Sequence, residues 1–254
     1  MRRATLFVAL VTLAAPAAHA EDAVACYEAS WSGMPAAQLR LAIHDGPDGY
    51  RNEVEIRTLG LARWVTKFHG SASGTGRIVA EHLPAPHSFG AHYDLRKRKN
   101  RILSLRFVVS NGTVVAERQP EDTSRKPELA EKFRRDVLDP LAVLAAIRQR
   151  LEEHPAAGFT IPAYDGARRF DVVTREPPRR ESGVIHLALT LHAIAGFKGE
   201  SSEDGDPDDA PRPVEVTFSD DRRLMPLSMT APIWYLPLTV ELTQWSSPGK
   251  GCAW

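Results

Sequence analysis

The sequence has no excess of charge of either sign. Lys and Arg total 32 of the 254 residues, Asp and Glu also total 32, and the formal net charge is zero. Proteins that bind nucleic acid carry a basic excess, and solvating tails carry an acidic one. Neither class fits this balance. A composition of 43% hydrophobic and 25% charged residues is typical of a globular chain.

Common catalytic motifs are also missing. The segment 70–74 places Ala72 where a Gly-x-Ser-x-Gly elbow needs its nucleophilic serine. There is no Cys-x-x-Cys, no His-Glu-x-x-His and no phosphate-binding glycine loop. The sequence therefore points to no catalytic residue, metal ligand or cofactor, and it favours a non-catalytic protein.

A marked hydrophobic run occurs only at the N-terminus. Arg2 and Arg3 precede an apolar stretch over residues 6–15, and residues 18–20 (AHA) resemble a signal-peptidase site. The stretch has about half of the ~20 residues that span a bilayer, so a cleaved signal fits better than an uncleaved anchor. We predict a signal peptide over residues 1–20 that is cut after Ala20, export to the periplasm, and no transmembrane segment in the mature chain.

The sequence has only two cysteines, Cys26 and Cys252, at opposite ends of the mature chain. In an oxidising compartment, such a pair favours one disulfide. The bond requires Cα atoms within about 7 Å, which a sheet whose first and last strands are neighbours would satisfy. Two free thiols, or a lipidation site at Cys26, are the alternatives.

Most of the mature chain alternates between apolar and polar residues, which predicts half-buried β-strands. The alternation occurs at residues 38–44, 51–57, 103–109, 187–192, 214–218 and 238–242. Asn111-Gly112, between two apolar runs, predicts a tight hairpin turn because both positions tolerate positive φ. Many strands with short turns therefore follow from the pattern.

One segment has helical spacing instead, with apolar residues at positions 141, 144, 147 and 151. We predict a helix over residues 140–153, with Asp139 as its cap and Pro140 in its first turn. The predicted fold is mainly β: a curved antiparallel sheet or open β-barrel, with this one amphipathic helix packed against it. We expect a single domain over residues 21–254.

Several residues are candidates for ligand contact. His186, Thr190 and His192 share one face of a predicted strand, and they would contact a ligand if this face lines a cavity or be solvated if it does not. Trp31 fits a core or barrel-rim position better than a sugar platform. The basic run 96–101 fits contact with an anionic lipid head group or polysaccharide, or else a charged hairpin tip. The acidic run 203–209 fits a surface loop better than a calcium site.

Four short segments occur in a fixed order: 27–33 (YEASWSG), 139–144 (DPLAVL) leading to Arg148, 159–166 (FTIPAYDG) with Arg168, and 219–221 (SDD) before Pro226-Leu227. Together they resemble the bacterial exported family DUF3108, a domain of unknown function, over nearly all of the mature chain. The resemblance implies an envelope protein built on a curved antiparallel sheet with a helix, distantly similar in layout to the open barrels of periplasmic lipoprotein carriers. It implies no established activity.

The matched polar residues also have structural interpretations. Asp139 would cap the helix, and Asp165 would form a turn that includes Arg168. Asp220 and Asp221 would end a strand. Arg148 lies at the border of the apolar stripe, where it could contact a ligand or pair with a carboxylate such as Asp165 or Asp220.

We predict an exported, non-catalytic protein that binds an apolar or amphipathic envelope molecule, with lipid and polysaccharide as candidate ligands, or a partner protein. No nucleic-acid partner is expected. One alternative is a hydrolase of envelope polysaccharide or lipid that uses paired carboxylates such as Asp165 and Asp220. Another is an assembly factor that acts through a sheet edge. The sequence leaves the oligomeric state open.

Overall fold

The computed structural model describes residues 21–46, 49–65, 67–124, 127–197, 210–233, 236–246 and 252. The predicted signal peptide and the acidic run 203–209 lie outside these residues. Strands make up most of the described chain: β1 (Glu21–Trp31), β2 (Met34–Gly46), β3 (Gly49–Thr58), β4 (His69–Arg77), β5 (Ala85–Leu95), β6 (Arg98–Ser110), β7 (Thr113–Arg118), β8 (Thr160–Tyr164), β9 (Arg169–Thr174), β10 (Arg179–Glu181), β11 (Val184–Ala195), β12 (Arg212–Ser219), β13 (Pro226–Ile233) and β14 (Leu236–Ser246).

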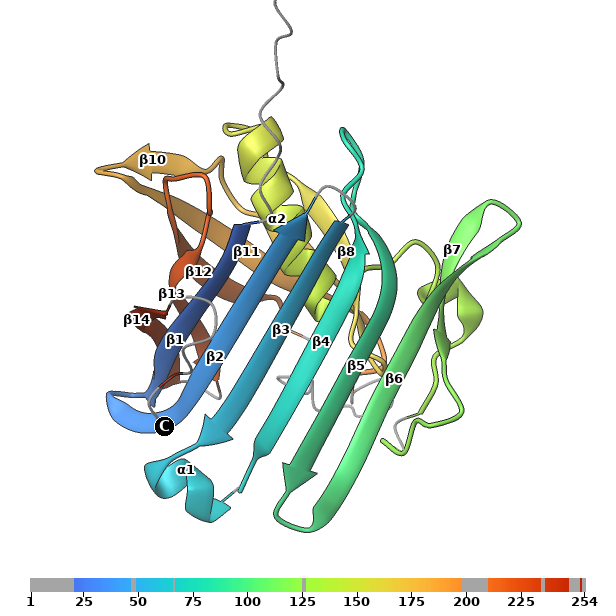
Figure 1. Ribbon diagram of the computed structural model, residues 1–254, viewed down its shortest axis with the longest axis horizontal. Coiled ribbons are helices and arrows are strands. Elements are labelled where there is room, and N and C mark those ends of the chain that lie inside the picture. The colour runs from blue at the N-terminus through green and yellow to red at the C-terminus, as the bar shows by residue number, and fades with distance from the viewer. Residues whose placement is uncertain are drawn as a thin grey trace, which may run out of the picture.

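These strands form one 14-stranded sheet that curves into an open barrel (Figure 1). The order is β7-β6-β5-β4-β3-β2-β1-β14-β13-β12-β11-β9-β8, and β10 pairs with β11. Neighbouring strands are antiparallel throughout, and β1 lies between β2 and β14. The predicted mainly β fold, with first and last strands side by side, is confirmed.

A stretch of chain outside the named strands links the two edges of the sheet. Residues 134–138 run between the edge strands β7 and β8. Four backbone hydrogen bonds, two to each edge, hold this stretch: Ala116 N to Arg134 O, Asp136 N to Val114 O, Leu138 N to Pro162 O and Tyr164 N to Leu138 O. The open sheet is thereby joined into a ring.

The helix α2 (Pro140–Glu153) lies inside the curved sheet, over the predicted residues (Figure 1). Its N-terminal amides are satisfied by Asp139, whose side chain accepts hydrogen bonds from Leu141 N and Ala142 N at 2.9 Å. The helix begins inside the barrel, and its last turn reaches the end drawn at the top of Figure 1, which we call the upper end. The lower end carries α1 (Gly60–Val65) and the β5–β6 hairpin.

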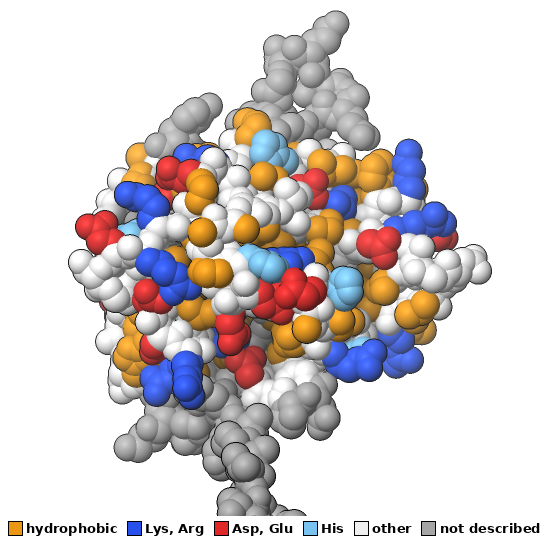
Figure 2. Space-filling model, turned by 90° about the horizontal axis from the view of Figure 1, so that it is seen from above, with side chains coloured by type: hydrophobic (Ala, Val, Ile, Leu, Met, Phe, Trp, Pro, Cys, Tyr) orange, Lys and Arg blue, Asp and Glu red, His pale blue; other side chains and the backbone are white. Residues whose placement is uncertain are grey.

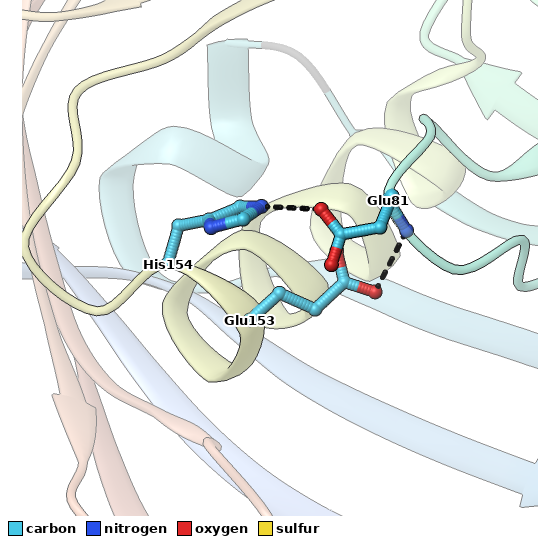
Figure 3. Close-up of side chains that lie close together, drawn as sticks. All are labelled: Glu81, Glu153 and His154. Carbon is cyan, nitrogen blue, oxygen red and sulfur yellow. Dashed lines mark hydrogen bonds and ion pairs between the residues drawn. The ribbon is translucent and has the colours of Figure 1, made fainter.

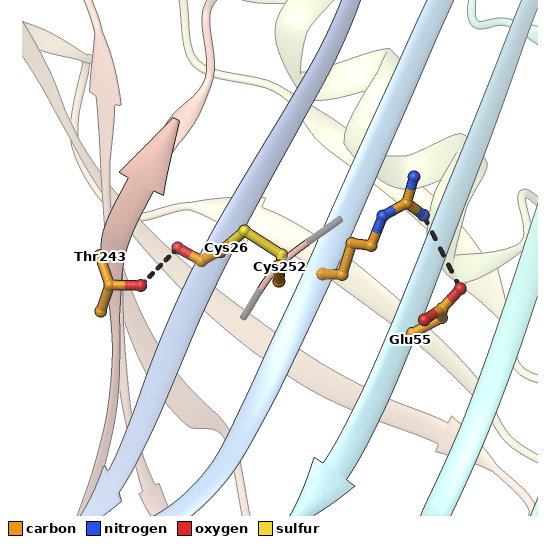
Figure 4. Close-up of a disulfide and its surroundings, with 5 residues drawn as sticks. Cys26, Glu55, Thr243 and Cys252 are labelled. Atoms are coloured by element: carbon orange, nitrogen blue, oxygen red, sulfur yellow. Dashed lines mark hydrogen bonds and ion pairs between the residues drawn. A yellow bond between two sulfur atoms is a disulfide. The ribbon is translucent and has the colours of Figure 1, made fainter. Parts of the chain in front are cut away.

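The structure contains the predicted disulfide. Cys26 in β1 is bonded to Cys252, and their Cα atoms are 5.7 Å apart (Figure 4). Thr243 Oγ1 in β14 donates a hydrogen bond to Cys26 O at 3.0 Å. The bond therefore holds the C-terminal end of the chain against the β1–β14 pair.

Local turn chemistry also agrees with the sequence. Asn111 and Gly112 have φ of 51° and 77° in the β6–β7 turn, as the predicted hairpin requires. Sequence periodicity missed α1, which is only one or two turns long, whereas the polar segment 128–137, where a turn or two of helix is predicted, contains the 3₁₀ turn Glu131–Phe133. Among the described residues, no helix is both long and apolar enough to cross a membrane.

Candidate functional site

The helix fills only the upper half of the barrel. It has 14 residues, so it is about 21 Å long, whereas the 13 residues of β2 or β6 extend over roughly 40 Å. Its cap, Asp139, lies against Gly74 in β4: a Cβ built on Gly74 would be 2.9 Å from Asp139 Oδ1. Below this point the inner face of β3–β6 has no helix packed on it.

An apolar cavity of about 400 Å³ occupies this lower space. It lies among the facing residues of four strands, because the register places Val54, Ala72, Ala91 and Leu103 side by side. The complete lining is Val54, Ile56, Phe68, Gly70, Ser71, Ala72, Phe89, Ala91, Tyr93, Leu95, Leu103, Ser124 and Asp165. Several lining side chains, Ile56, Tyr93 and Leu95 among them, are only partly buried, so the cavity is open to solvent.

The cavity lies where small inward residues are not covered by α2. Ala72 and Ala91 present only a methyl group there, whereas Gly74, higher on β4, packs directly against Asp139 and Leu141 at the start of the helix. Large residues of the same sheet line the space without filling it. A packed protein interior leaves few voids larger than a water molecule, so a space of this size is a departure from ordinary core packing.

A second cavity of about 290 Å³ adjoins the first at the lower end. Asp165 lines both. The second cavity is lined mainly by apolar residues of the opposite half of the sheet: Phe170, Leu191, Ala193 and Phe197, with Pro140, Ala210, Arg168 and Arg212. The two cavities therefore lie on either side of one charged residue below the start of α2.

Asp165 is not a free carboxylate. Arg168 donates to Asp165 Oδ2 through Nε and Nη2 at 2.8 and 2.7 Å, and the backbone amides of Ala167 and Arg168 donate to Oδ1. This pairing closes the predicted turn between β8 and β9. These hydrogen bonds fix the position of the Asp165 carboxylate, which therefore lines both cavities as a charge already paired with Arg168.

A buried polar cluster lies directly above the first cavity. Asn52 Nδ2 donates to Leu141 O at 2.9 Å, beside the Asp139 cap. Asn52 Oδ1, Asp139 Oδ2 and Tyr50 Oη are buried and have no hydrogen-bond partner among the described residues. Burial raises the pKa of the Asp139 carboxyl to about 7, although the amides of Ala142 and Leu141 oppose the rise.

A larger hollow lies on the outer face of the same strands but has a different character. Its volume is about 620 Å³, and its lining includes Arg51, Glu53, Glu55, Ser71, Ser73, His92, Ser104 and Glu121. Its charged groups already have partners, since Arg51 pairs with Glu53 at 2.6 Å and Ser104 Oγ donates to Glu121 at 2.7 Å. Charged and polar side chains make up more than half of the lining residues of this groove, so the inner cavity, whose lining is more strongly apolar, is the better candidate for a ligand with apolar surface.

The upper end of the barrel is closed by charged contacts. Glu81, Glu153 and His154 meet where the β4–β5 loop contacts the last turn of α2 (Figure 3). His154 Nε2 lies 3.1 Å from Glu81 Oε2, and Gln149 donates to Glu153 at 2.8 Å. Their ligand atoms lie within 4.8 Å of one another, close enough for one cation, but each group already has a protein partner. Figure 2 shows this end, with acidic, basic and histidine side chains interspersed.

The structure separates the predicted ligand-contact residues from the cavities. His186, Thr190 and His192 lie on the face of β11 opposite to Leu187, Leu189 and Leu191, which pack in the core, and they line neither inner cavity. Trp31 lies at the lower end of β1, where it pairs with Met34 and Leu238. Trp31 and His192 are the members of this set that lie toward the open end.

Arg148 has a different partner from those suggested by the sequence. Its Nη2 lies 2.8 Å from Asp45 Oδ2 at the upper end of β2, and its Nε and Nη2 donate to Arg223 O. Asp165 and Asp220 are each engaged elsewhere. Arg148 therefore fastens α2 to the upper rim, and the suggested pairing with Asp165 or Asp220 is wrong.

The carboxylate pair of the hydrolase alternative does not form. Asp165 follows β8 near the lower end of β11, whereas Asp220 follows β12 at the upper end, where Ser219 pairs with Val184. The 12 residues of β11 separate these ends by roughly 35 Å, far beyond the spacing of a glycosidase pair. Asp220 is instead paired with Arg180, and Asp221 accepts from Ser219 Oγ and Arg223 N within the turn.

Sequence reasoning missed the residues that form the cavity. Residues 69–77 (HGSASGTGR) form β4, although the sequence predicts no strand there. Glycine and serine give no hydrophobic alternation, so this strand has no periodic signal. The available signal was the alternation of very small residues at every second position, which leaves space on one face of a strand.

Comparison with known families matched the DUF3108 profile, described as a protein of unknown function, over residues 26–243. Comparison with curated proteins found no match. Among solved structures, the chain is similar to a β-barrel-like protein of domain of unknown function DUF1849 from Brucella abortus. The TM-score is 0.53 and the identity 12%, and the match covers 88% of this chain and 96% of that one. This similarity supports the barrel-like fold alone.

Proposed function

Since the chain belongs to the DUF3108 family, for which no activity is established, we propose a function from its geometry: it binds an amphipathic molecule whose apolar part occupies the inner cavity. In this proposal the N-terminal signal exports the protein, and the ligand is a lipid-like molecule of the cell envelope. The protein holds the molecule without chemical change.

The observation that carries the proposal is the apolar space of about 400 Å³, left where α2 stops. Small-molecule sites in proteins have volumes of about 300–1,000 Å³ and are lined mainly by apolar and aromatic side chains with a few polar groups. Phe68, Phe89 and Tyr93 supply the aromatic lining, and Asp165 and Ser124 supply polar groups. Each methylene that leaves water for this space gains about 0.8 kcal/mol.

Titration of the disulfide-bonded protein with cis-parinaric acid tests the proposal, because this fatty acid fluoresces when its chain leaves water. We expect saturable binding, and we expect native mass spectrometry of protein purified from its own periplasm to show a retained lipid. Absence of both signals would contradict the proposal.

Two variants locate the bound molecule. Ala72→Phe adds a ring on the inner face of β4 and should abolish cis-parinaric acid binding by filling the cavity. Ser73→Phe adds the same ring on the outer face of the same strand, so it should leave binding within about twofold of the wild type. Circular dichroism establishes that both variants fold. Equal binding by the two folded variants would place the ligand elsewhere.

A further inference from the structure

The lower end of the barrel, where the cavity opens, is strongly basic on one side. Two stretches meet there: residues 57–69, which include α1, and residues 94–101, which form the β5–β6 hairpin. Together they contain eight Lys or Arg residues and one acidic residue, Asp94, in a chain whose formal net charge is zero. Arg63, Lys67, Lys97 and Lys99 are exposed.

Asp94 is the one acidic residue within these two stretches. Lys99 lies 3.4 Å from Asp94, whose pKa is lowered first by the hydrogen bond from Asn100 N and then by contact with Lys99. Arg101 donates to Thr123 O and contacts no carboxylate among the described residues. These two stretches therefore carry an excess of positive charge on one side of the cavity opening.

Exposed apolar side chains lie at the same end. Met34, at the start of β2, and Leu236, at the start of β14, are 45% and 42% exposed. The β1–β2 turn lies beside the start of β14, since Ser32 N donates to Pro237 O at 2.8 Å. Exposed apolar side chains also occur at the upper end, but there they do not accompany a basic excess.

The upper end provides the contrast within this molecule. Its charged groups form opposite-sign pairs: Arg148 with Asp45, Arg180 with Asp220, and His154 with Glu81. The charged groups of the upper end are therefore paired with one another. At the lower end the two basic stretches carry positive charge on one side, while the connection between β11 and β12, which joins that end on the other side, contains the acidic run 203–209.

We propose that the lower end docks onto the surface of a lipid bilayer that contains anionic phospholipid. Residues 57–69 and 94–101 supply the attraction, and Met34 and Leu236 enter the head-group region. The inference rests on the proposed function, because docking in this orientation places the cavity opening against the membrane from which an amphipathic ligand would come. Each Lys or Arg near such a surface strengthens binding by about fivefold, and salt weakens the attraction.

Co-sedimentation of the disulfide-bonded chain with vesicles tests the inference. We expect binding to vesicles of phosphatidylglycerol mixed with phosphatidylcholine, weaker binding as salt rises, and little binding to phosphatidylcholine alone. Arg63→Glu combined with Lys97→Glu should weaken binding at least about 25-fold, since two attractions become repulsions. Arg77→Glu combined with Arg222→Glu makes the same change in net charge at exposed sites of the upper end, so it should have an effect of about twofold or less.

The outcomes separate this inference from the proposed function. Equal losses in the two double variants, or equal binding to neutral and anionic vesicles, would overturn docking through the lower end. Ala72→Phe should still bind anionic vesicles, because it fills the cavity without changing the rim. Vesicle binding without any binding of cis-parinaric acid would support docking while contradicting the proposed cavity ligand. Binding of cis-parinaric acid without binding to anionic vesicles would support the cavity ligand and contradict docking through the lower end.

Discussion

The two halves of the barrel are built from one continuous sheet but are filled in different ways. In the upper half, α2 packs against inward-facing side chains, and Leu151, Ile185 and Phe218 are almost completely buried. In the lower half no helix packs inside the sheet, and Ala72 and Ala91 present only a methyl group to the space. The presence of α2, rather than the size of the inward residues of β4, thus decides whether this part of the sheet encloses a core or a cavity, because the inward residues of β4 are small in both halves.

The first prediction compares the same truncation in the two halves. Leu151→Ala removes a fully buried side chain from the upper core and should lower the free energy of unfolding by about 2–5 kcal/mol. Leu95→Ala removes a partly exposed side chain from the cavity lining and should cost about 1 kcal/mol or less, because less apolar surface returns to water. Urea unfolding measures both values. Equal losses would mean that the lower half is packed like the upper one.

The second prediction concerns Asp139, at the boundary between the halves. Its folded-state pKa is about 7, whereas an unfolded aspartate titrates near about 3.9, so the folded chain binds more protons between these values. The stability contributed by the protonated carboxyl is complete below about pH 4 and is lost as the pH rises to about 7.

Asp139→Asn keeps the capping oxygen but cannot ionise. The stability of the variant relative to the wild type should therefore rise across this window, by up to about 4 kcal/mol. Unfolding curves at several pH values provide the measurement. Parallel pH profiles for the two proteins would show that Asp139 titrates normally in the folded chain.

The smallest expected effect compares two glycines on neighbouring strands. A Cβ at Gly74 would be 2.9 Å from Asp139 Oδ1 and 3.0 Å from Leu141 Cβ, so Gly74→Ala should destabilise the fold by about 1–3 kcal/mol. Gly90, on β5, has nothing within 4 Å of such a Cβ, and Gly90→Ala should be neutral within about 0.5 kcal/mol. Thermal unfolding would check both, and a neutral Gly74→Ala would contradict the close approach of the helix start to β4.

The strands and the helix could be predicted where the pattern of apolar, polar and capping residues reflects which side chains are buried. Leu39, Leu41 and Ile43 alternate because one face of β2 is buried, and Asp139-Pro140 marks the start of α2 because both residues suit a helix N-terminus. No comparable signal exists for β4, whose small residues are neither clearly apolar nor polar. The cavity was unpredictable for the same reason.

The partners of charged residues were also beyond the sequence. Arg148 pairs with Asp45, which lies 103 positions away, because the curvature of the sheet brings the upper end of β2 to α2. Likewise, the basic run 96–101 is evident in the sequence, but its position beside an apolar cavity depends on the register of β3–β6. The Arg148–Asp45 pair and the position of the basic run both depend on the tertiary arrangement, which the local sequence does not show.

The stretch 134–138 completes the circumference of the barrel by linking β7 to β8. Its hydrogen bonds to Val114 and Ala116 on one side, and to Pro162 and Tyr164 on the other, would all have to break before the wall could part along that seam. In the proposed function, the ligand would therefore enter and leave along the barrel axis through the lower end, because hydrogen-bonded strands surround it and α2 closes the upper end.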